Sequence, residues 1–153
     1  MKILVIGTGM YVIGRNTDTY GTVFPAIIEF QRANKIKNLE VIFAGKNISN
    51  MRKSKKKILK ALKISDINIK VIFYLKNKNY DYRSILKNEK NLSCAIVAVP
   101  DHLHFKIVDE CLNYNLHTLV VKPFTTKLIE AKKLIKKQLN KRLHGLIEFH
   151  KRF

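Results

Sequence analysis

Short runs of aliphatic residues alternate along this chain with longer stretches in which apolar positions recur at helical spacing. The first run, Lys2–Ile6, reads Lys-Ile-Leu-Val-Ile and shows no alternation of polar and apolar positions. Such a run is typical of a strand that is buried on both faces of a parallel sheet. Similar runs predict further strands at residues 39–44, 69–75, 94–99, 117–121 and 143–150.

The stretches between these runs have the periodicity of amphipathic helices. They predict helices at residues 22–33, 51–63, 102–115 and 125–139, and a short helix that begins after Asp81. Thr and Asp side chains accept hydrogen bonds from the first amides of a helix, so the expected caps are Thr22, Asp81 and either Thr125 or Thr126. The side chains expected to face inward are Met51, Ile58, Leu59, Leu62, Ile85, Leu86, Phe105, Ile107, Val108 and Leu112.

Regular alternation of strands and helices predicts right-handed crossovers and an α/β fold with a mainly parallel sheet covered by helices on both faces. No repeat and no Pro-, Gly- or Ser-rich linker divides the chain, so residues 1–153 are expected to form a single domain. Ligands of open α/β sheets bind beyond the carboxyl ends of the strands. The candidate functional positions are therefore residues 7–14, 45–47, 100–104 and 122–123.

A glycine-rich turn, Gly7-Thr8-Gly9, directly follows the first strand. Glycines in this position let the backbone approach a pyrophosphate, which indicates a doubly wound, Rossmann-type dinucleotide-binding domain. The third glycine of the usual fingerprint is replaced by Val12, and the next glycines are Gly14 and Gly21. We therefore expect an enlarged loop from Thr8 to Gly21, with the helix starting late; the alternative is a glycine turn that binds nothing. The residues expected to contact the dinucleotide here are Gly7, Thr8, Gly9, Met10, Gly14 and Arg15.

The second strand ends in Ala44-Gly45-Lys46-Asn47, where an acidic residue usually binds the adenosine ribose hydroxyls of NAD. Lys46 and Asn47 are the expected cofactor contacts at this end. Lys46 could favour the 2′-phosphate of NADP, with help from Arg15 or Arg52, but these side chains could equally be ordinary solvated cations. The sequence leaves NAD and NADP both open.

Charge and composition bear on whether the protein binds nucleic acid, spans a membrane or binds a metal through its cysteines. Lys and Arg number 30 against 11 acidic residues, a formal net charge of +19, which raises nucleic acid as a partner. The Lys-rich stretches at residues 52–57 and 127–142 lack the interleaved aromatic residues that stack on bases, so solvated helix faces are expected instead. No apolar run approaches the ~20 residues of a membrane helix. Cys94 and Cys111 have no metal-ligand spacing, and reduced core thiols in a cytoplasmic protein are expected.

The later strand ends resemble those of one enzyme family. Residues 97–104 (VAVPDHLH), residues 115–123 (NLHTLVVKP) and Tyr80–Leu86 (YDYRSIL) resemble the N-terminal domain of the glucose-fructose oxidoreductase/inositol dehydrogenase/MocA (Gfo/Idh/MocA) oxidoreductases. The resemblance covers essentially the whole chain. It implies a domain that binds NAD or NADP, in which Pro100, Asp101 and His104 lie along the nicotinamide half of the cofactor.

The resemblance also implies a catalytic role for Lys122. In the family, the Lys of the Glu-Lys-Pro motif lies beside the nicotinamide and the substrate hydroxyl, and here this motif reads Val121-Lys122-Pro123. A Lys at a strand end can help to move the hydroxyl proton as hydride leaves; the alternative is a surface Lys before a turn-forming Pro. His102 and His104 alternate as metal ligands do, but no third ligand is evident, so no metal is expected.

The sequence departs from the family in two ways. Val121 replaces the usual Glu. The family's second domain, which supplies the substrate pocket and a catalytic His, is expected to be absent from these residues, either because they are one domain of a longer protein or because the product is naturally shortened; His117, His144 and His150 do not match its motif. Apolar surface around Phe149 and Phe153 is then expected to favour self-association.

We therefore expect the dinucleotide-binding domain of an oxidoreductase that moves hydride between a nicotinamide cofactor and a sugar, sugar nucleotide or cyclitol hydroxyl. By itself such a domain should turn over little substrate, because the surface that orients the substrate is missing. Two other classes stay open. One is a non-catalytic nucleotide-binding or interaction module that keeps the fold, and the other is a basic nucleic-acid binder.

Overall fold

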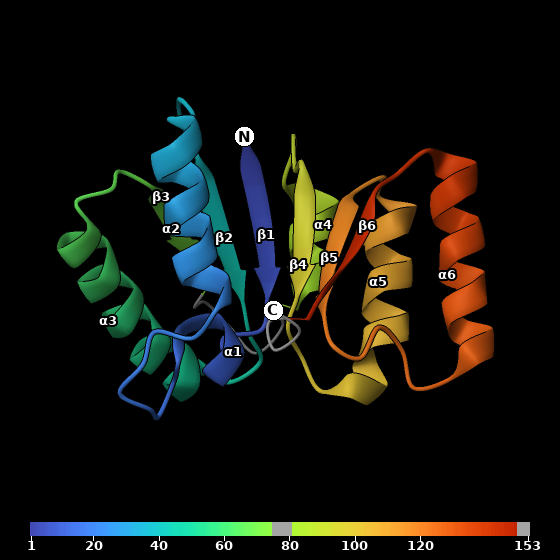
Figure 1. The fold of residues 1–153 in the computed structure, drawn as a ribbon, viewed down its shortest axis with the longest axis horizontal. Coiled ribbons are helices and arrows are strands. Elements are labelled where there is room, and N and C mark those ends of the chain that lie inside the picture. Colours follow the sequence, from blue (N-terminus) through green and yellow to red (C-terminus); the bar gives the residue numbers. More distant parts are fainter. Residues whose placement is uncertain (75–80, 150–153) are drawn as a thin grey trace.

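The computed structural model describes residues 1–74 and 81–149, which form one six-stranded sheet in the order β3-β2-β1-β4-β5-β6 (Figure 1). Every pair of neighbouring strands is parallel. The strands are β1 (Lys2–Ile6), β2 (Glu40–Ala44), β3 (Lys70–Phe73), β4 (Cys94–Val97), β5 (His117–Val121) and β6 (Gly145–Glu148). The predicted α/β fold with a parallel sheet is confirmed. Leu75, Tyr80, His150 and Phe153, which the sequence analysis used, lie outside the described residues.

Helices connect the strands in the predicted alternation. They are α1 (Met10–Ile13), α2 (Val23–Asn34), α3 (Ile48–Ser65), α4 (Tyr82–Asn88), a 3₁₀ turn η1 (Asp101–Leu103), α5 (His104–Asn113) and α6 (Leu128–Lys141). The chain runs from β1 outward to β3 on one side, then restarts at β4 on the other side of β1. The strand order thus reverses between β1 and β4, the place where open α/β sheets bind ligands.

Successive residues of β1 enter two separate cores, because side chains of a strand alternate between the faces of the sheet. Ile3 and Val5 pack with the buried residues of α2 and α3, whereas Leu4 and Ile6 pack with those of α4, α5 and α6. Figure 1 shows the result: α2 crosses in front of the sheet, whereas α5 lies behind it. Burial on both faces explains why the strands read as unbroken aliphatic runs.

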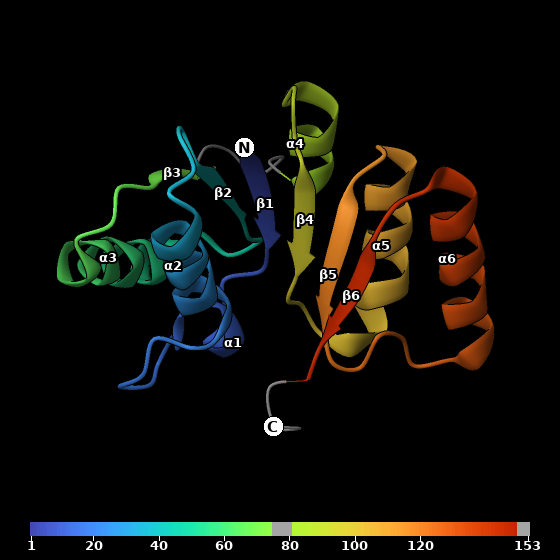
Figure 2. The same cartoon turned by 45° about the horizontal axis from the view of Figure 1, so that its top comes forward.

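The front face of β4, β5 and β6 carries no helix among the described residues (Figure 2). An apolar groove of about 590 Å³ lies there, with Phe30, Ile96, Leu119 and Leu146 among its lining. Leu146 is 62% exposed and Phe149 is 41% exposed. The expected apolar surface near Phe149 is therefore present, and self-association through it stays a prediction.

The segment after the glycine turn differs from the expectation of a continuous loop from Thr8 to Gly21. The helix α1 begins at Met10, directly after Gly9, and only the longer helix α2 starts late, at Val23. Thr22 does not cap α2 with its side chain; its hydroxyl donates to the Tyr11 carbonyl at 3.3 Å and so ties α2 to α1. The strand-turn-helix order of a phosphate-binding loop is thus kept, in a shortened form.

Other helix starts were predicted with mixed success. Asp81 caps α4 as expected, since its carboxylate accepts from the amide of Arg83 at 3.2 Å. The expected Thr cap of α6 is wrong: that helix begins at Leu128 with Lys127 as its cap residue, and the Thr125 hydroxyl donates to the Lys127 carbonyl. Leu59, expected to face inward, is 46% exposed. The buried face of α3 runs through Met51, Ser54, Ile58 and Ala61, and Leu59 lies at the side of this face.

Restoring the usual fingerprint at Val12 should destabilise the protein. Val12 is fully buried in the core that also holds Ile13 and Phe24. Val12→Gly should lower the free energy of unfolding by about 3 kcal/mol, from the lost apolar burial, the cavity and the helix cost of glycine. Urea denaturation measures this. Met10→Ala, at a 56% exposed position of the same helix, is the control and should change stability by less than about 0.5 kcal/mol. Equal stability of Val12→Gly and the unmodified chain would contradict the packing.

Candidate functional site

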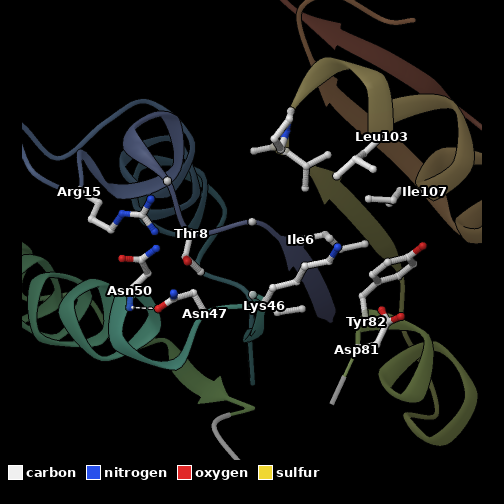
Figure 3. Close-up of a pocket in the computed structure, with 17 residues that line it drawn as sticks. Ile6, Thr8, Arg15, Lys46, Asn47, Asn50, Asp81, Tyr82, Leu103 and Ile107 are labelled. Atoms are coloured by element: carbon white, nitrogen blue, oxygen red, sulfur yellow. Dashed lines mark hydrogen bonds between the residues drawn. The ribbon is translucent and has the colours of Figure 1, made fainter. Parts of the chain in front are cut away.

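A cleft of about 270 Å³ lies at the carboxyl ends of the central strands, where the strand order reverses. Figure 3 shows its lining side chains, which come from the β1–α1 turn on one side and from α4 and the β4–α5 connection on the other. The lining residues are Ile6, Gly7, Thr8, Gly9, Arg15, Ala44, Gly45, Lys46, Asn47, Asn50, Asp81, Tyr82, Ala98, Val99, Pro100, Leu103 and Ile107.

Gly7 lies where the carboxyl ends of β1, β2 and β4 meet. Its amide donates to the Ala44 carbonyl after β2 at 2.8 Å, and a Cβ added to it would lie 2.0 Å from the Ala98 carbonyl oxygen after β4. Its φ of 109° is in the region that side chains disfavour. A residue with a side chain therefore cannot replace Gly7 without moving the backbone.

Gly9 has a different reason to be glycine. It is the cap residue of α1, and apart from its immediate chain neighbours no atom lies within 4 Å of the position that its Cβ would occupy. Protein packing therefore does not demand glycine here. The open space stands over the first amides of α1, which have no acceptor within their own helix. A ligand that approaches the backbone closely would need this space.

Side chains of helix α3 support the glycine turn through hydrogen bonds to its backbone and to the segment that follows it. The Ser54 hydroxyl, which is fully buried, donates to the Thr8 carbonyl at 2.9 Å. The Lys57 ammonium donates to the carbonyls of Gly14 and Thr17, each at 2.6 Å. These bonds fix both the glycine turn and the following segment that carries Arg15. Neither Ser54 nor Lys57 could be assigned from the sequence, since both look like solvated positions of a basic helix.

At the end of β2, Gly45, Lys46 and Asn47 line the cleft, and contact of Lys46 and Asn47 with a cofactor stays a prediction. The Asn47 side chain caps α3 by accepting from the amide of Asn50 at 2.9 Å. Arg15, from the segment that follows α1, points into the cleft, and its guanidinium lies near Asn50 and Thr8 in Figure 3. Asn50 was missed by sequence reasoning, although its place one turn after a capping Asn was a usable signal.

The opposite wall is braced by an ionic network. Arg83 donates two hydrogen bonds of 2.8 Å to the Glu110 carboxylate, which also accepts from the Tyr82 hydroxyl at 2.6 Å. Burial and the hydrogen bond to Glu110 raise the pKa of Tyr82. Burial works to raise the pKa of Glu110, but the hydrogen bonds from Arg83 and Tyr82 outweigh it and keep this pKa below its ordinary value. The network anchors α4 to α5 and so positions Tyr82 and Asp81 at the cleft.

Several predicted cofactor contacts lie outside the lining of this cleft. Of the residues that were expected beside the nicotinamide, Pro100 lines the cleft, whereas Asp101 and Lys122 are exposed at the same edge of the sheet. Met10 points to solvent, and Gly14 lies beyond α1. Val121, at the position of the family's Glu, is buried in the core next to α1 and α2.

His104 is fully buried and lies between two carbonyl oxygens. Its Nδ1 is 2.6 Å from the Pro123 oxygen and its Nε2 is 2.9 Å from the Val99 oxygen. Both partners are acceptors, and the tautomer of the ring decides which of the two oxygens receives its N–H. His104 thus joins the connection after β4 to Pro123 rather than lining the cleft. By fixing Pro123 it sets the place of the neighbouring Lys122.

Residues 1–143 match the model of a family described as an oxidoreductase family with an NAD-binding Rossmann fold, Gfo/Idh/MocA. The chain belongs to this family. A protein of Schizosaccharomyces pombe described as an uncharacterised oxidoreductase is 30% identical over 76 residues, which are 50% of this chain and 21% of that protein. This Gfo/Idh/MocA chain therefore spans about a fifth of the curated relative.

Solved structures show the same fold. An NAD-binding oxidoreductase from Klebsiella pneumoniae has a TM-score of 0.66 at 12% identity, over 97% of this chain and 34% of that one. A 3-ketoreductase from Actinomadura kijaniata in complex with NADP has a TM-score of 0.64 at 17% identity, over 97% and 38%. The WlbA dehydrogenase from Chromobacterium violaceum, in complex with NADH and UDP-GlcNAcA, has 0.64 at 14%, over 97% and 34%.

Two negative findings concern the described part of this Gfo/Idh/MocA chain. Residues 1–74 and 81–149 contain no helix that is both long enough and apolar enough to cross a membrane. They also hold no group of three or more His, Cys, Asp or Glu side chains arranged to bind a metal ion. Cys94 and Cys111 are free thiols, and burial raises the pKa of both.

Replacing His104 should cost stability where a buried carbonyl is left unpaired. His104→Phe keeps a ring of similar shape but removes both ring nitrogens, so the buried carbonyl to which the ring donates loses its donor and the free energy of unfolding should fall by about 2 kcal/mol or more. His104→Gln can still donate to a carbonyl and should lose less. Urea denaturation of the two variants checks this. Equal losses, or none, would show that hydrogen bonding by the ring does not hold the loops.

Glu110 should make stability depend on pH in the acid range. Its pKa is lower in the folded chain than the ordinary 4.5, so the unfolded chain takes up the proton first as the pH falls. The stabilising contribution is therefore present above the ordinary pKa and is lost as the pH drops through the folded pKa. Glu110→Gln should lack this part of the dependence, in unfolding curves measured from neutral pH downward. Parallel curves for the two proteins would contradict the network.

Proposed function

We propose that this chain is the dinucleotide-binding part of an oxidoreductase that moves hydride between NAD(P) and the hydroxyl-bearing carbon of a sugar, sugar nucleotide or cyclitol. The observation that carries the proposal is the open turn at Gly9. It lies between β1 and α1 at the point where the strand order reverses, in a chain that belongs to an oxidoreductase family. This is where a Rossmann fold binds pyrophosphate.

The residues at the cleft fit the three parts of a dinucleotide. The backbone from Gly7 to Gly9 would bind the pyrophosphate, with Met10 and Gly14 bounding α1. The end of β2, with Lys46 and Asn47, would bind the adenosine ribose. Pro100, Asp101, Lys122 and Pro123 lie at the ends of β4 and β5 and would adjoin the nicotinamide. When bound, the cofactor supplies the hydride donor or acceptor.

Lys122 is the proposed catalytic residue. Its ammonium is exposed at the end of β5, on the edge of the sheet that carries the cleft. From there it would hold the substrate hydroxyl and take up or return its proton as hydride moves. His104 is a positioning residue and not a cleft residue, because its ring contacts the carbonyl of Pro123, the residue next to Lys122.

Support for a carbohydrate-type substrate comes from the structural relatives, which include a 3-ketoreductase and a dehydrogenase with a bound UDP-sugar acid. The chain spans only 34–38% of those proteins. We propose that a further domain orients the substrate and that this domain alone binds cofactor with little turnover. We also propose a cytoplasmic location, where nicotinamide cofactors and reduced thiols are found.

Val121 favours a second candidate, a non-catalytic nucleotide-binding module. A buried apolar side chain stands where the family's motif has a carboxylate beside the catalytic Lys. We prefer the enzyme because Lys122 is kept and because His104 holds the loop beside it in place.

The paired glycines test the proposed function. Gly9→Ala should fold normally, because its Cβ enters open space, yet weaken dinucleotide binding by about tenfold or more, because the same space receives the pyrophosphate. Gly7→Ala should instead destabilise the fold by collision with Ala98. Quenching or enhancement of NADH and NADPH fluorescence gives the affinity, and thermal unfolding gives the stability. No binding of either cofactor at millimolar concentration, or unchanged affinity of a folded Gly9→Ala, would overturn the proposal.

A further inference from the structure

We infer that the adenosine end of the cleft is a 2′-phosphate site, so that this domain selects NADP(H) over NAD(H). The inference rests on the proposed function, since it names which dinucleotide the site takes. It is carried by three observations at the end of β2: a glycine where a carboxylate would be needed, two cations without ionic partners, and a scaffold that holds one of these cations in place.

The first observation is the packing at Gly45. NAD-binding domains of this fold use an acidic residue near the end of the second strand to accept from the ribose hydroxyls. A Cβ at Gly45 would lie 3.0 Å from the Met51 methyl and 3.2 Å from the Thr8 hydroxyl. A side chain there would press on the Met51 methyl and the Thr8 hydroxyl, and both would have to shift by a few tenths of an ångström. The close packing therefore favours glycine at this position, and the chain has no carboxylate there to accept from the ribose hydroxyls.

The second observation is the uncompensated charge. Lys46 and Arg15 both line the cleft, and among residues 1–74 and 81–149 neither takes part in an ion pair. The Nε of Arg15 is buried and has no hydrogen-bond partner there. Figure 3 places Arg15 beside Asn50 and Thr8, with Asp81 on the opposite wall. Asp81 is occupied by its 2.6 Å ion pair with Arg83.

The third observation is that Arg15 is carried on a fixed segment. The Lys57 ammonium binds the carbonyls of Gly14 and Thr17, one residue before and two residues after Arg15. Helix α3, 18 residues long, also begins at this wall, and its first turn adds partial positive charge. Because the backbone on both sides of Arg15 is fixed, its guanidinium can offer donors to phosphate oxygens at a smaller entropic cost than one on an unfixed loop. An uncharged ribose hydroxyl gains little from such a site.

The test compares two dinucleotides that differ only in the 2′-phosphate. Fluorescence titration of the full chain at low salt should give a Kd for NADPH about tenfold or more below that for NADH, and the ratio should shrink as salt rises. Adenosine 2′,5′-bisphosphate should likewise displace NADPH better than 5′-AMP does.

Charge-removing variants locate the site. Arg15→Gln and Lys46→Gln should each lower the ratio of NADPH affinity to NADH affinity by about fivefold or more, because both dinucleotides share the ribose contacts and only NADPH carries the 2′-phosphate. Lys60→Gln is the matched control, because it removes the same charge from an exposed position of α3 that does not line the cleft. It should change neither affinity.

The possible outcomes distinguish failure of the inferred NADP(H) preference from failure of the proposed dinucleotide binding. If neither dinucleotide binds, the proposed function fails. If NADH binds as tightly as NADPH, the domain binds dinucleotides but the 2′-phosphate site is refuted. If Arg15→Gln and Lys46→Gln weaken both dinucleotides equally, these cations serve the pyrophosphate, and the inference is overturned. An equal loss of NADPH affinity in Lys60→Gln would assign the preference to overall charge, which overturns it as well.

Discussion

The close approach of backbones at Gly7 is the constraint on which the rest of the site depends. One residue hydrogen-bonds to the end of β2 and lies against the end of β4, with no room for a side chain between. This contact brings the ends of three strands together at the reversal of strand order. The cleft, the exposed turn at Gly9 and the β4–α5 connection all take their positions from it.

Around that contact, the fold compensates for an atypical loop. Val12 fills the core where the usual fingerprint has glycine, and α1 is only 4 residues long. Helix α3 takes over the support, since Ser54 holds the Thr8 carbonyl and Lys57 holds the segment after α1. The Lys-rich sequence of α3, which raised nucleic acid as a partner, thus has a structural use in at least one of its cations.

The sequence predicted the fold well because strands that are buried on both faces of a parallel sheet consist of unbroken aliphatic runs, which can be recognised in the sequence. It predicted the strand-end location of the cleft because ligands of open α/β sheets bind beyond the carboxyl ends of the strands. It did not predict α1, because a helix of 4 residues shows no period. Ser54, Asn50 and the Tyr82–Glu110 contact also escaped, because their roles depend on which helix faces which loop. His104 was expected to touch the cofactor, yet its ring nitrogens face the carbonyls of Val99 and Pro123, a role that a motif alone does not reveal.

The account's central claim is that a nicotinamide dinucleotide binds with its pyrophosphate on the turn from Gly7 to Gly9. Amide chemical-shift mapping of the isotope-labelled chain during titration with NADPH tests it most directly. The account predicts saturable shifts that are largest for the amides of Thr8, Gly9 and Met10, with smaller ones at Lys46 and Pro100's neighbours. Shifts confined to the apolar face of β4–β6, or no saturable shift at the glycine turn, would contradict it.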